Sequence, residues 1–306
     1  MVAAVSAACE IVCRTDDRAA WLEARRTGIG SSDAPAVLGV SPWSSPLLVY
    51  AEKIGEREDL EPSEAQEWGL LLEPTIIREF ARETGRLAEQ SRVLVRSTAR
   101  PWQLATIDAE QEAPDKPGPG LLEVKATGFR AGDWSEGVPE HVTVQVQHQL
   151  DVKGYLWGSV AVLMNGCKMR WIDVERNEAL IEKIREAEAD FWQRVERREP
   201  VNPDGSPATR EALRFLYPRD TGETIALPGE FIDLDDERCR LKDEAKMLDA
   251  RLDEIDNLIK AAIGAATFGE LANGVRYALK TTKNPGYSVE PFEFRALRRR
   301  APKERA

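Results

Sequence analysis

The 306-residue chain has few of the side chains that bind soft metal ions, with only two His and four Cys. His141 and His148 have no neighbouring His or Cys, and Cys9 and Cys13 lack the second pair that would complete a zinc site. A bound metal ion would therefore be held by carboxylates, which favours Mg²⁺ or Mn²⁺. Four scattered Cys also indicate reduced thiols rather than a disulfide scaffold.

Long apolar runs and a secretory signal are missing as well. No stretch approaches the roughly 18 apolar residues of a membrane span. Residues 1–8 are small and apolar but lack the basic segment with which a secretory signal begins. We therefore expect a cytoplasmic protein with no membrane partner.

The charge is unevenly distributed along the chain. A net charge of -11 argues against a nucleic-acid partner when it is taken as a whole. Residues 274–306, however, contain nine Lys or Arg against three Glu, a net charge of about +6. This basic tail is read equally well as a DNA contact or as a solvated end of the chain.

The spacing of apolar residues predicts an α/β protein. Helices are expected over 16–27, 34–38, 46–54, 64–84, 139–155 and 177–198. Strands are expected over 93–108, with an interruption at Arg100-Pro101, and over 121–126, 159–164 and 168–175. The last two are joined by the hairpin signal Asn165-Gly166. A Pro-rich and Gly-rich loop is expected over 113–120.

The pattern after residue 198 predicts a division into domains. Residues 1–199 form one domain, and the Pro-rich and Gly-rich residues 200–230 read as a linker. Residues 231–306 form a helical arm and the basic tail. Apolar residues in the arm are spaced by alternating steps of four and three, which is a coiled-coil-like seam: Leu241, Ala245, Leu248, Leu252, Ile255 and Ile259.

Three charged residues suggest a site for a hard cation. Glu123 and Lys125 lie two apart on a predicted strand and therefore share a face, with the Val124 carbonyl between them. Asp108 ends the preceding strand-like stretch, and an antiparallel pairing would bring it beside Glu123. Carboxylates and a carbonyl oxygen suit Mg²⁺, and a neighbouring Lys can orient a metal-bound water for attack on a phosphodiester.

These residues resemble the core of the PD-(D/E)XK nucleases, and the surrounding motifs resemble the YqaJ-type viral recombinase family, which is related to lambda exonuclease. The resemblance covers about residues 15–198. The motifs are 21–26 (WLEARR), 28–33 (GIGSSD), 69–74 (GLLLEP), 105–108 (ATID), 122–125 (LEVK) and 145–150 (QVQHQL). Many relatives have Pro-Asp-Gly where this chain has Ile107-Asp108-Ala109.

The resemblance implies a restriction-endonuclease-like mixed sheet flanked by helices. It also implies Mg²⁺-dependent digestion of duplex DNA from the 5′ end, which leaves 3′ single strands for recombination and suggests a phage origin. Partners would be DNA ends, an annealing or single-strand-binding protein, and further copies of the chain. The implied residue roles are metal binding by Glu73, Asp108, Glu123 and the Val124 carbonyl, water positioning by Lys125 and Gln145, and 5′-phosphate binding by Arg25 and Ser32.

Other interpretations of the same residues stay open. Glu73 could be a solvated helix residue, Asp108 a turn cap, and Glu123 with Lys125 a surface ion pair. Gln145, Gln147 and Gln149 could form a polar helix face, and Arg25 and Ser32 could serve helix ends. We interpret His141 and His148 as surface or DNA-facing side chains. Alternative functions are an endonuclease on the same core or a non-catalytic recombination scaffold.

Overall fold

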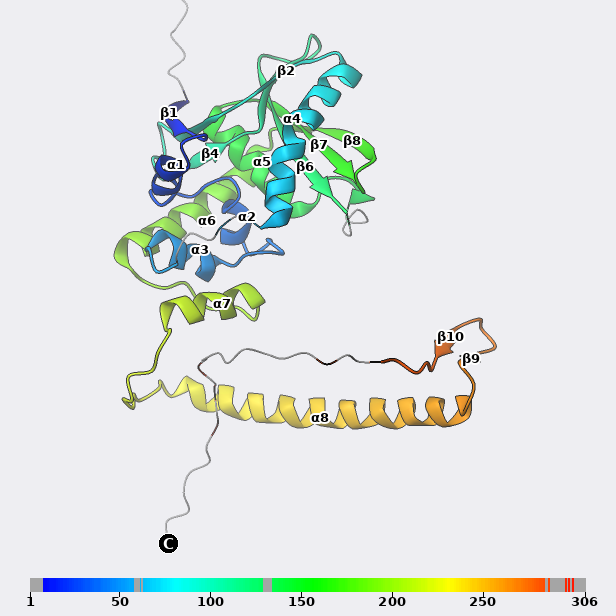
Figure 1. Ribbon diagram of the computed structural model, residues 1–306. Helices are drawn as coiled ribbons and strands as arrows, with labels where there is room; N and C mark the ends of the chain where they lie inside the picture. The colour runs from blue at the N-terminus through cyan, green and yellow to red at the C-terminus, as the bar shows by residue number, and fades with distance from the viewer. Residues whose placement is uncertain are drawn as a thin grey trace, which may run out of the picture. The chain divides into compact units, whose positions relative to one another are not determined.

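The computed structural model describes residues 8–57, 61, 63–128, 134–283, 286, 295, 297 and 299. It divides into two compact units, Met1–Pro218 and Arg219–Ala306, which are described separately (Figure 1).

The first unit is built on a five-stranded sheet in the order β2-β5-β6-β7-β8. The strands are β2 (Leu87–Gln90), β5 (Ala109–Glu112), β6 (Gly120–Thr127), β7 (Trp157–Met164) and β8 (Lys168–Glu175). Within this sheet β6 and β7 pair in parallel and the other neighbours pair antiparallel, so the sheet is mixed, as the resemblance implies. A parallel pair needs a long crossover, and helix α5 (Glu140–Lys153) provides it.

Helices cover both faces of this sheet. Neighbouring residues of β6 face opposite sides, because side chains alternate along a strand. Leu122 packs in a cluster with Ile76 and Phe80 of α4 (Glu64–Thr84), whereas Leu121 packs with Val146 of α5. The sheet is thus the middle of three layers, with α4 and α5 on opposite sides (Figure 1).

Local signals set the ends of α4, the longest helix of the first unit. Ser63 accepts a hydrogen bond from the Gln66 backbone, and the Gln66 side chain accepts from the Ser63 backbone, which forms a capping box. Gly85 ends the helix in the left-handed conformation, with φ 69°. The helix therefore spans the residues predicted for it.

A three-stranded antiparallel sheet and further helices complete the body of the first unit. The strands are β1 (Cys9–Arg14), β3 (Val93–Ser97) and β4 (Leu104–Thr106), in the order β1-β3-β4. The helices are α1 (Arg18–Arg25), α2 (Ala34–Val37), α3 (Pro46–Lys53) and α6 (Glu178–Arg197). The strand-like stretch 93–108 divides into β3 and β4 on either side of Arg100-Pro101, where the sequence predicts an interruption. Asp108 directly precedes β5, a short polar strand that the sequence analysis did not predict.

The first unit extends past residue 199, into the range read as a linker. Helix α7 (Pro207–Leu216) begins where Ser206 accepts a hydrogen bond from Thr209 N, with Pro207 in the first turn. Its Ala208 and Ala212 are buried against α3. Part of the Pro-rich segment is therefore a helix packed on the core.

The described residues of the second unit include one long helix and a small hairpin. Helix α8 (Glu230–Ile263) has 34 residues, and none of them is buried. The hairpin pairs β9 (Phe268–Glu270) with β10 (Arg276–Ala278). The helical arm is confirmed as a helix, whereas most of the basic tail, including Arg298 and Arg300, lies outside the described residues. No helix in the described part of the chain is long and apolar enough to cross a membrane.

Candidate active site

Strand β6 presents Glu123 and Lys125 on the face that α5 covers. Lys125 Nζ donates a hydrogen bond to Glu123 Oε1 and another, of 3.2 Å, to Gln145 Oε1. The Glu123 side chain is almost fully buried, while that of Lys125 is 29% exposed. The pair is therefore not a surface ion pair: the carboxylate lies inside, and the ammonium group reaches a cavity.

Two amides of α5 hold the Glu123 carboxylate. Gln145 Nε2 donates to Glu123 Oε1 over 2.7 Å, and Gln149 Nε2 donates to Glu123 Oε2 over 2.7 Å. These two Gln lie four residues apart, on one face of the helix. Gln147 points elsewhere and donates to the Glu175 carbonyl. The second amide at Glu123 thus comes from Gln149, for which the sequence alone suggests only a place on a polar helix face.

Asp108 lies beside Glu123 because of the register between β5 and β6. Ala109 pairs with Leu122 in an antiparallel register. Asp108, which precedes Ala109, therefore lies opposite Glu123, which follows Leu122. Asp108 Oδ2 accepts a hydrogen bond of 2.7 Å from Val124 N. The predicted antiparallel juxtaposition of Asp108 and Glu123 is therefore present.

Glu73 approaches the same region from α4. It is half-buried, and its Oε1 accepts a hydrogen bond of 2.8 Å from Gln90 Nε2 of β2. Burial raises the pKa of Glu73, the Gln90 hydrogen bond opposes this effect, and the Glu123 carboxylate adds to it. Glu73 is therefore electrostatically coupled to the site rather than a solvated helix residue.

The charges of the site influence one another strongly. Burial raises the pKa of Asp108 well above its usual value, and the carboxylates of Glu123 and Glu73 raise it further. Burial alone would lower the pKa of Lys125, but the Glu123 and Asp108 carboxylates outweigh this effect and raise it. Excess negative charge is thus concentrated around one ammonium group, an arrangement that a bound cation would stabilise.

The donor atoms suit a hard divalent cation, although each carboxylate is hydrogen-bonded to other groups. Three carboxylates and the Val124 carbonyl are oxygen donors of the kind that Mg²⁺ prefers. Within the described residues, no group of three or more His, Cys, Asp or Glu is close enough to hold a metal ion. Hydrogen bonds from Gln90, Gln145 and Gln149 hold the carboxylates of Glu73 and Glu123. Metal binding would therefore require rotation of these side chains.

Arg25 and Ser32 have different surroundings. Arg25 Nη2 lies 3.0 Å from Asp33 Oδ1 and 3.4 Å from Glu52 Oε1, with its guanidinium over the Trp21 ring. Ser32 is exposed and lines the cavity that Lys125 reaches. The structure therefore brings Ser32 to the site, while acidic side chains already surround Arg25.

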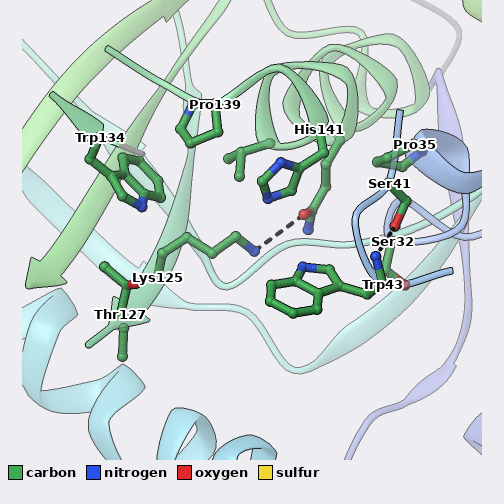
Figure 2. A pocket seen from close by; sticks show the side chains of 12 residues that line it. Ser32, Pro35, Ser41, Trp43, Lys125, Thr127, Trp134, Pro139 and His141 are labelled. Atoms are coloured by element: carbon green, nitrogen blue, oxygen red, sulfur yellow. Dashed lines mark hydrogen bonds between the residues drawn. The ribbon is translucent and has the colours of Figure 1, made fainter. Parts of the chain in front are cut away.

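This cavity has a volume of about 270 Å³ (Figure 2). Lys125 and Gln145 line it together with three aromatic side chains, Trp43, Trp134 and His141. These aromatic residues were not predicted as part of the site. They come from the loop after α2, the segment after β6 and the first turn of α5, so no local motif joins them.

The surface interpretation of His148 is wrong. Its ring is fully buried, and its two nitrogens contact Glu188 Oε1 at 2.6 Å and the Leu104 carbonyl at 2.8 Å. Burial alone would lower the pKa of His148, but the Glu188 carboxylate outweighs it and raises the pKa. Because both partners accept hydrogen bonds, the ring is an imidazolium that ties α5 to α6.

Comparison with known proteins places the chain in a family. The YqaJ-like viral recombinase domain matches residues 20–156. The uncharacterized protein YqaJ of Bacillus subtilis (strain 168) is 32% identical over 260 residues, which cover 83% of this chain and 80% of that protein. The chain belongs to the YqaJ-like viral recombinase family. The match to the domain includes Arg25, Glu73, Asp108, Glu123 and Lys125.

The fold of this YqaJ-like protein also matches solved structures. An alkaline exonuclease from Laribacter hongkongensis superimposes with a TM-score of 0.50 and 22% sequence identity. The match covers 58% of this chain and 93% of that enzyme. The predicted restriction-endonuclease-like class, a mixed sheet flanked by helices, is therefore confirmed.

Proposed function

We propose that the protein is a Mg²⁺-dependent exonuclease that degrades duplex DNA from the 5′ end and leaves 3′ single strands for recombination. One observation carries the proposal. Glu123, Lys125 and Gln145 form one hydrogen-bonded cluster beside a cavity, and Asp108 accepts a hydrogen bond from Val124 N between Glu123 and Lys125, in a member of the YqaJ-like viral recombinase family. The fold shared with an alkaline exonuclease supports the same reaction class.

In this proposal, Glu73, Asp108, Glu123 and the Val124 carbonyl hold the cation, Mg²⁺ or Mn²⁺. A divalent ion with such ligands supplies a water of lowered pKa and polarises a phosphoryl oxygen. Lys125 Nζ orients the attacking water, and Gln145 holds Lys125 through the 3.2 Å hydrogen bond. Gln149 donates a hydrogen bond to the second oxygen of the Glu123 carboxylate, Oε2, and so holds its orientation.

The preference for a 5′ end is assigned to Ser32 and Arg25. The Ser32 hydroxyl shares the cavity with Lys125, so it can donate to a phosphate placed there. Arg25 lies close in sequence and carries the charge that a terminal phosphate needs, although Asp33 and Glu52 already surround it. Arg25 would therefore reach a phosphate only by exchanging one of these partners.

The partners follow from this reaction. The substrate is the end of a duplex, and the product strand would be passed to an annealing or single-strand-binding protein. Association of several copies, so that one duplex is held continuously, fits the same reaction. We place this work in the cytoplasm, which is the host cytoplasm if a phage encodes the chain.

Linear and circular duplexes distinguish the proposed activity from its alternatives. With Mg²⁺, the purified protein should release nucleotides from linear 5′-phosphorylated duplex and leave covalently closed circles intact. Cleavage of circles would instead indicate an endonuclease on the same core. No cleavage of either substrate, together with no Mg²⁺ or Mn²⁺ binding in calorimetry, would indicate a non-catalytic scaffold.

A further inference from the structure

One wall of the cavity beside Lys125 is an aromatic side chain that faces solvent. Trp43 is 64% exposed and lies in the loop between α2 and α3. Its backbone N donates to Ser41 Oγ over 3.2 Å, and Ser41 lines the same cavity, so this loop has a defined conformation. The indole is therefore held at the cavity by its backbone and is largely accessible.

The aromatic side chains are grouped around the tip of Lys125. Figure 2 shows the rings of Trp43, His141 and Trp134 around the end of the Lys125 side chain. Trp134 is buried and His141 is half-buried, so Trp43 offers by far the most open ring. A planar apolar ligand that entered here would lie against Trp43.

Polar groups line the cavity as well. Ser32 and Thr127 contribute hydroxyl groups, and Lys125 contributes the ammonium group. The cavity thus combines groups that bind phosphate with a flat aromatic surface that a base can stack on. These two features match the phosphate and the base of a nucleotide. Its volume of about 270 Å³ lies just below the roughly 300–1,000 Å³ of typical ligand pockets, which suits one nucleotide rather than a length of duplex.

We propose that Trp43 stacks on the nucleobase of the single nucleotide whose phosphate lies at Lys125. The inference rests on the proposed function for its substrate class, DNA. Base stacking on an aromatic ring accepts every base, because each base has a π face. Gln145, the amide on the lining, is engaged by Glu123 and Lys125, so it does not read base edges. Trp43 thus positions the terminal nucleotide without selecting its sequence.

Binding of small probes tests this inference without any hydrolysis. Calorimetry with the full chain and Mg²⁺ compares dAMP with deoxyribose 5-phosphate, which lacks the base. We expect dAMP to bind about five- to hundredfold more tightly. Trp43→Ala should remove this advantage, and Trp43→Phe should restore most of it. Trp68→Ala, which removes an exposed indole of α4 outside the cavity, should change nothing.

Equal binding of the two probes to the wild-type protein would overturn the inference, and so would an unchanged advantage in Trp43→Ala. A change of molecular mass in Trp43→Ala with unaltered dAMP affinity would also overturn it, because Trp43 would then be a contact between copies. Failure of the proposed function can be distinguished from failure of this inference. Trp43-dependent binding of dAMP without digestion of DNA would support the nucleotide site and contradict the proposed nuclease activity.

Discussion

Helices α5 and α8 show how differently the two units of this chain use polar and apolar residues. Helix α5 has 14 residues and buries nine of them, including Gln147, His148, Gln149 and Asp151. Helix α8 has 34 residues with a regular apolar seam and buries none. The unit with buried polar groups contains the candidate site, whereas the seam of α8 is not buried by any residue that the structure describes.

Burial of polar side chains on α5 is tolerated because each of them makes at least one hydrogen bond or ion pair. A buried polar group without a hydrogen bond is costly, and a buried charge costs more. His148 contacts Glu188, and Asp151 contacts Arg100, Arg176 and Arg185. These pairs join α5 to neighbouring elements and fix the face that carries Gln145 and Gln149.

Removal of Lys125 should have the largest effect. Lys125→Ala deletes the ammonium group that contacts Glu123 and Gln145, and positioned proton-transfer or water-orienting groups contribute about 10²- to 10⁴-fold to a rate. Nucleotide release from linear duplex should fall by that factor. The matched control is Lys260→Ala on α8, where Lys260 lies near Asp256, and its rate should equal that of the wild type. Equal losses in both variants would contradict a site confined to the first unit.

Breaking the His148–Glu188 pair should destabilise the first unit. Glu188→Ala leaves the buried imidazolium without its carboxylate, and loss of one partner of a buried pair costs about 3–5 kcal/mol. Glu188 also accepts a hydrogen bond of 2.7 Å from Gln103, which loses its partner too. Denaturant unfolding measures the change. Glu182→Ala, an exposed carboxylate of the same helix α6, should cost less than about 1 kcal/mol.

Acid should remove the contribution of Asp151. Burial acts to raise its pKa, but hydrogen bonds from Arg185 and Arg176 outweigh it and lower the pKa from 3.8 to about 2. Because the pKa of Asp151 is lower in the folded state, ionised Asp151 stabilises the folded protein at pH values above its ordinary pKa of 3.8. This stabilisation is lost as the pH falls through the lowered pKa. It amounts to about 2 kcal/mol. The stability difference between wild type and Asp151→Asn should therefore shrink from about pH 6 to about pH 2. A difference independent of pH would contradict the ionic role.

The smallest effect is expected on the seam of α8. Leu248 is 67% exposed, so Leu248→Gln should alter the free energy of unfolding by less than about 0.5 kcal/mol. Leu150→Ala on α5 removes the same residue type from a fully buried position and should cost about 2–5 kcal/mol. Light scattering measures the molecular mass, and hence the oligomeric state, of each variant. A large decrease in stability, or a decrease in the molecular mass of the assembly, in Leu248→Gln would show that the seam is buried in solution by another copy of the chain or by another part of it.

Local signals explain which elements the sequence could predict. The bounds of α4 follow from Ser63 and Gly85, and the β7–β8 hairpin follows from Asn165 and Gly166, both with positive φ. The start of α7 had a comparable signal in Ser206, but the surrounding Pro residues obscured it. Strand β5 had none: it is four residues long and forms only because β2 and β6 flank it.

The candidate site divides in the same way. Glu123 and Lys125 share a face because of the strand period, and the helical period could have identified Gln149 in place of Gln147 beside Gln145. The surroundings of His148 could not be foreseen, because Glu188 lies 40 residues from His148 in the sequence. For Arg25, the contact with Glu52 of α3 likewise depends on the tertiary structure. Likewise, only the tertiary structure brings Trp43 to the cavity of Lys125.

Digestion of end-labelled linear duplex with Mg²⁺ is the most direct test of the central claim. Duplexes labelled on one strand, at the 5′ end or at the 3′ end, are compared for the wild-type protein and Lys125→Ala. We expect the wild-type protein to release the 5′ label at once and to shorten 3′-labelled strands progressively, and Lys125→Ala to do neither. Early release of the 3′ label, or digestion by Lys125→Ala at the wild-type rate, would contradict the claim.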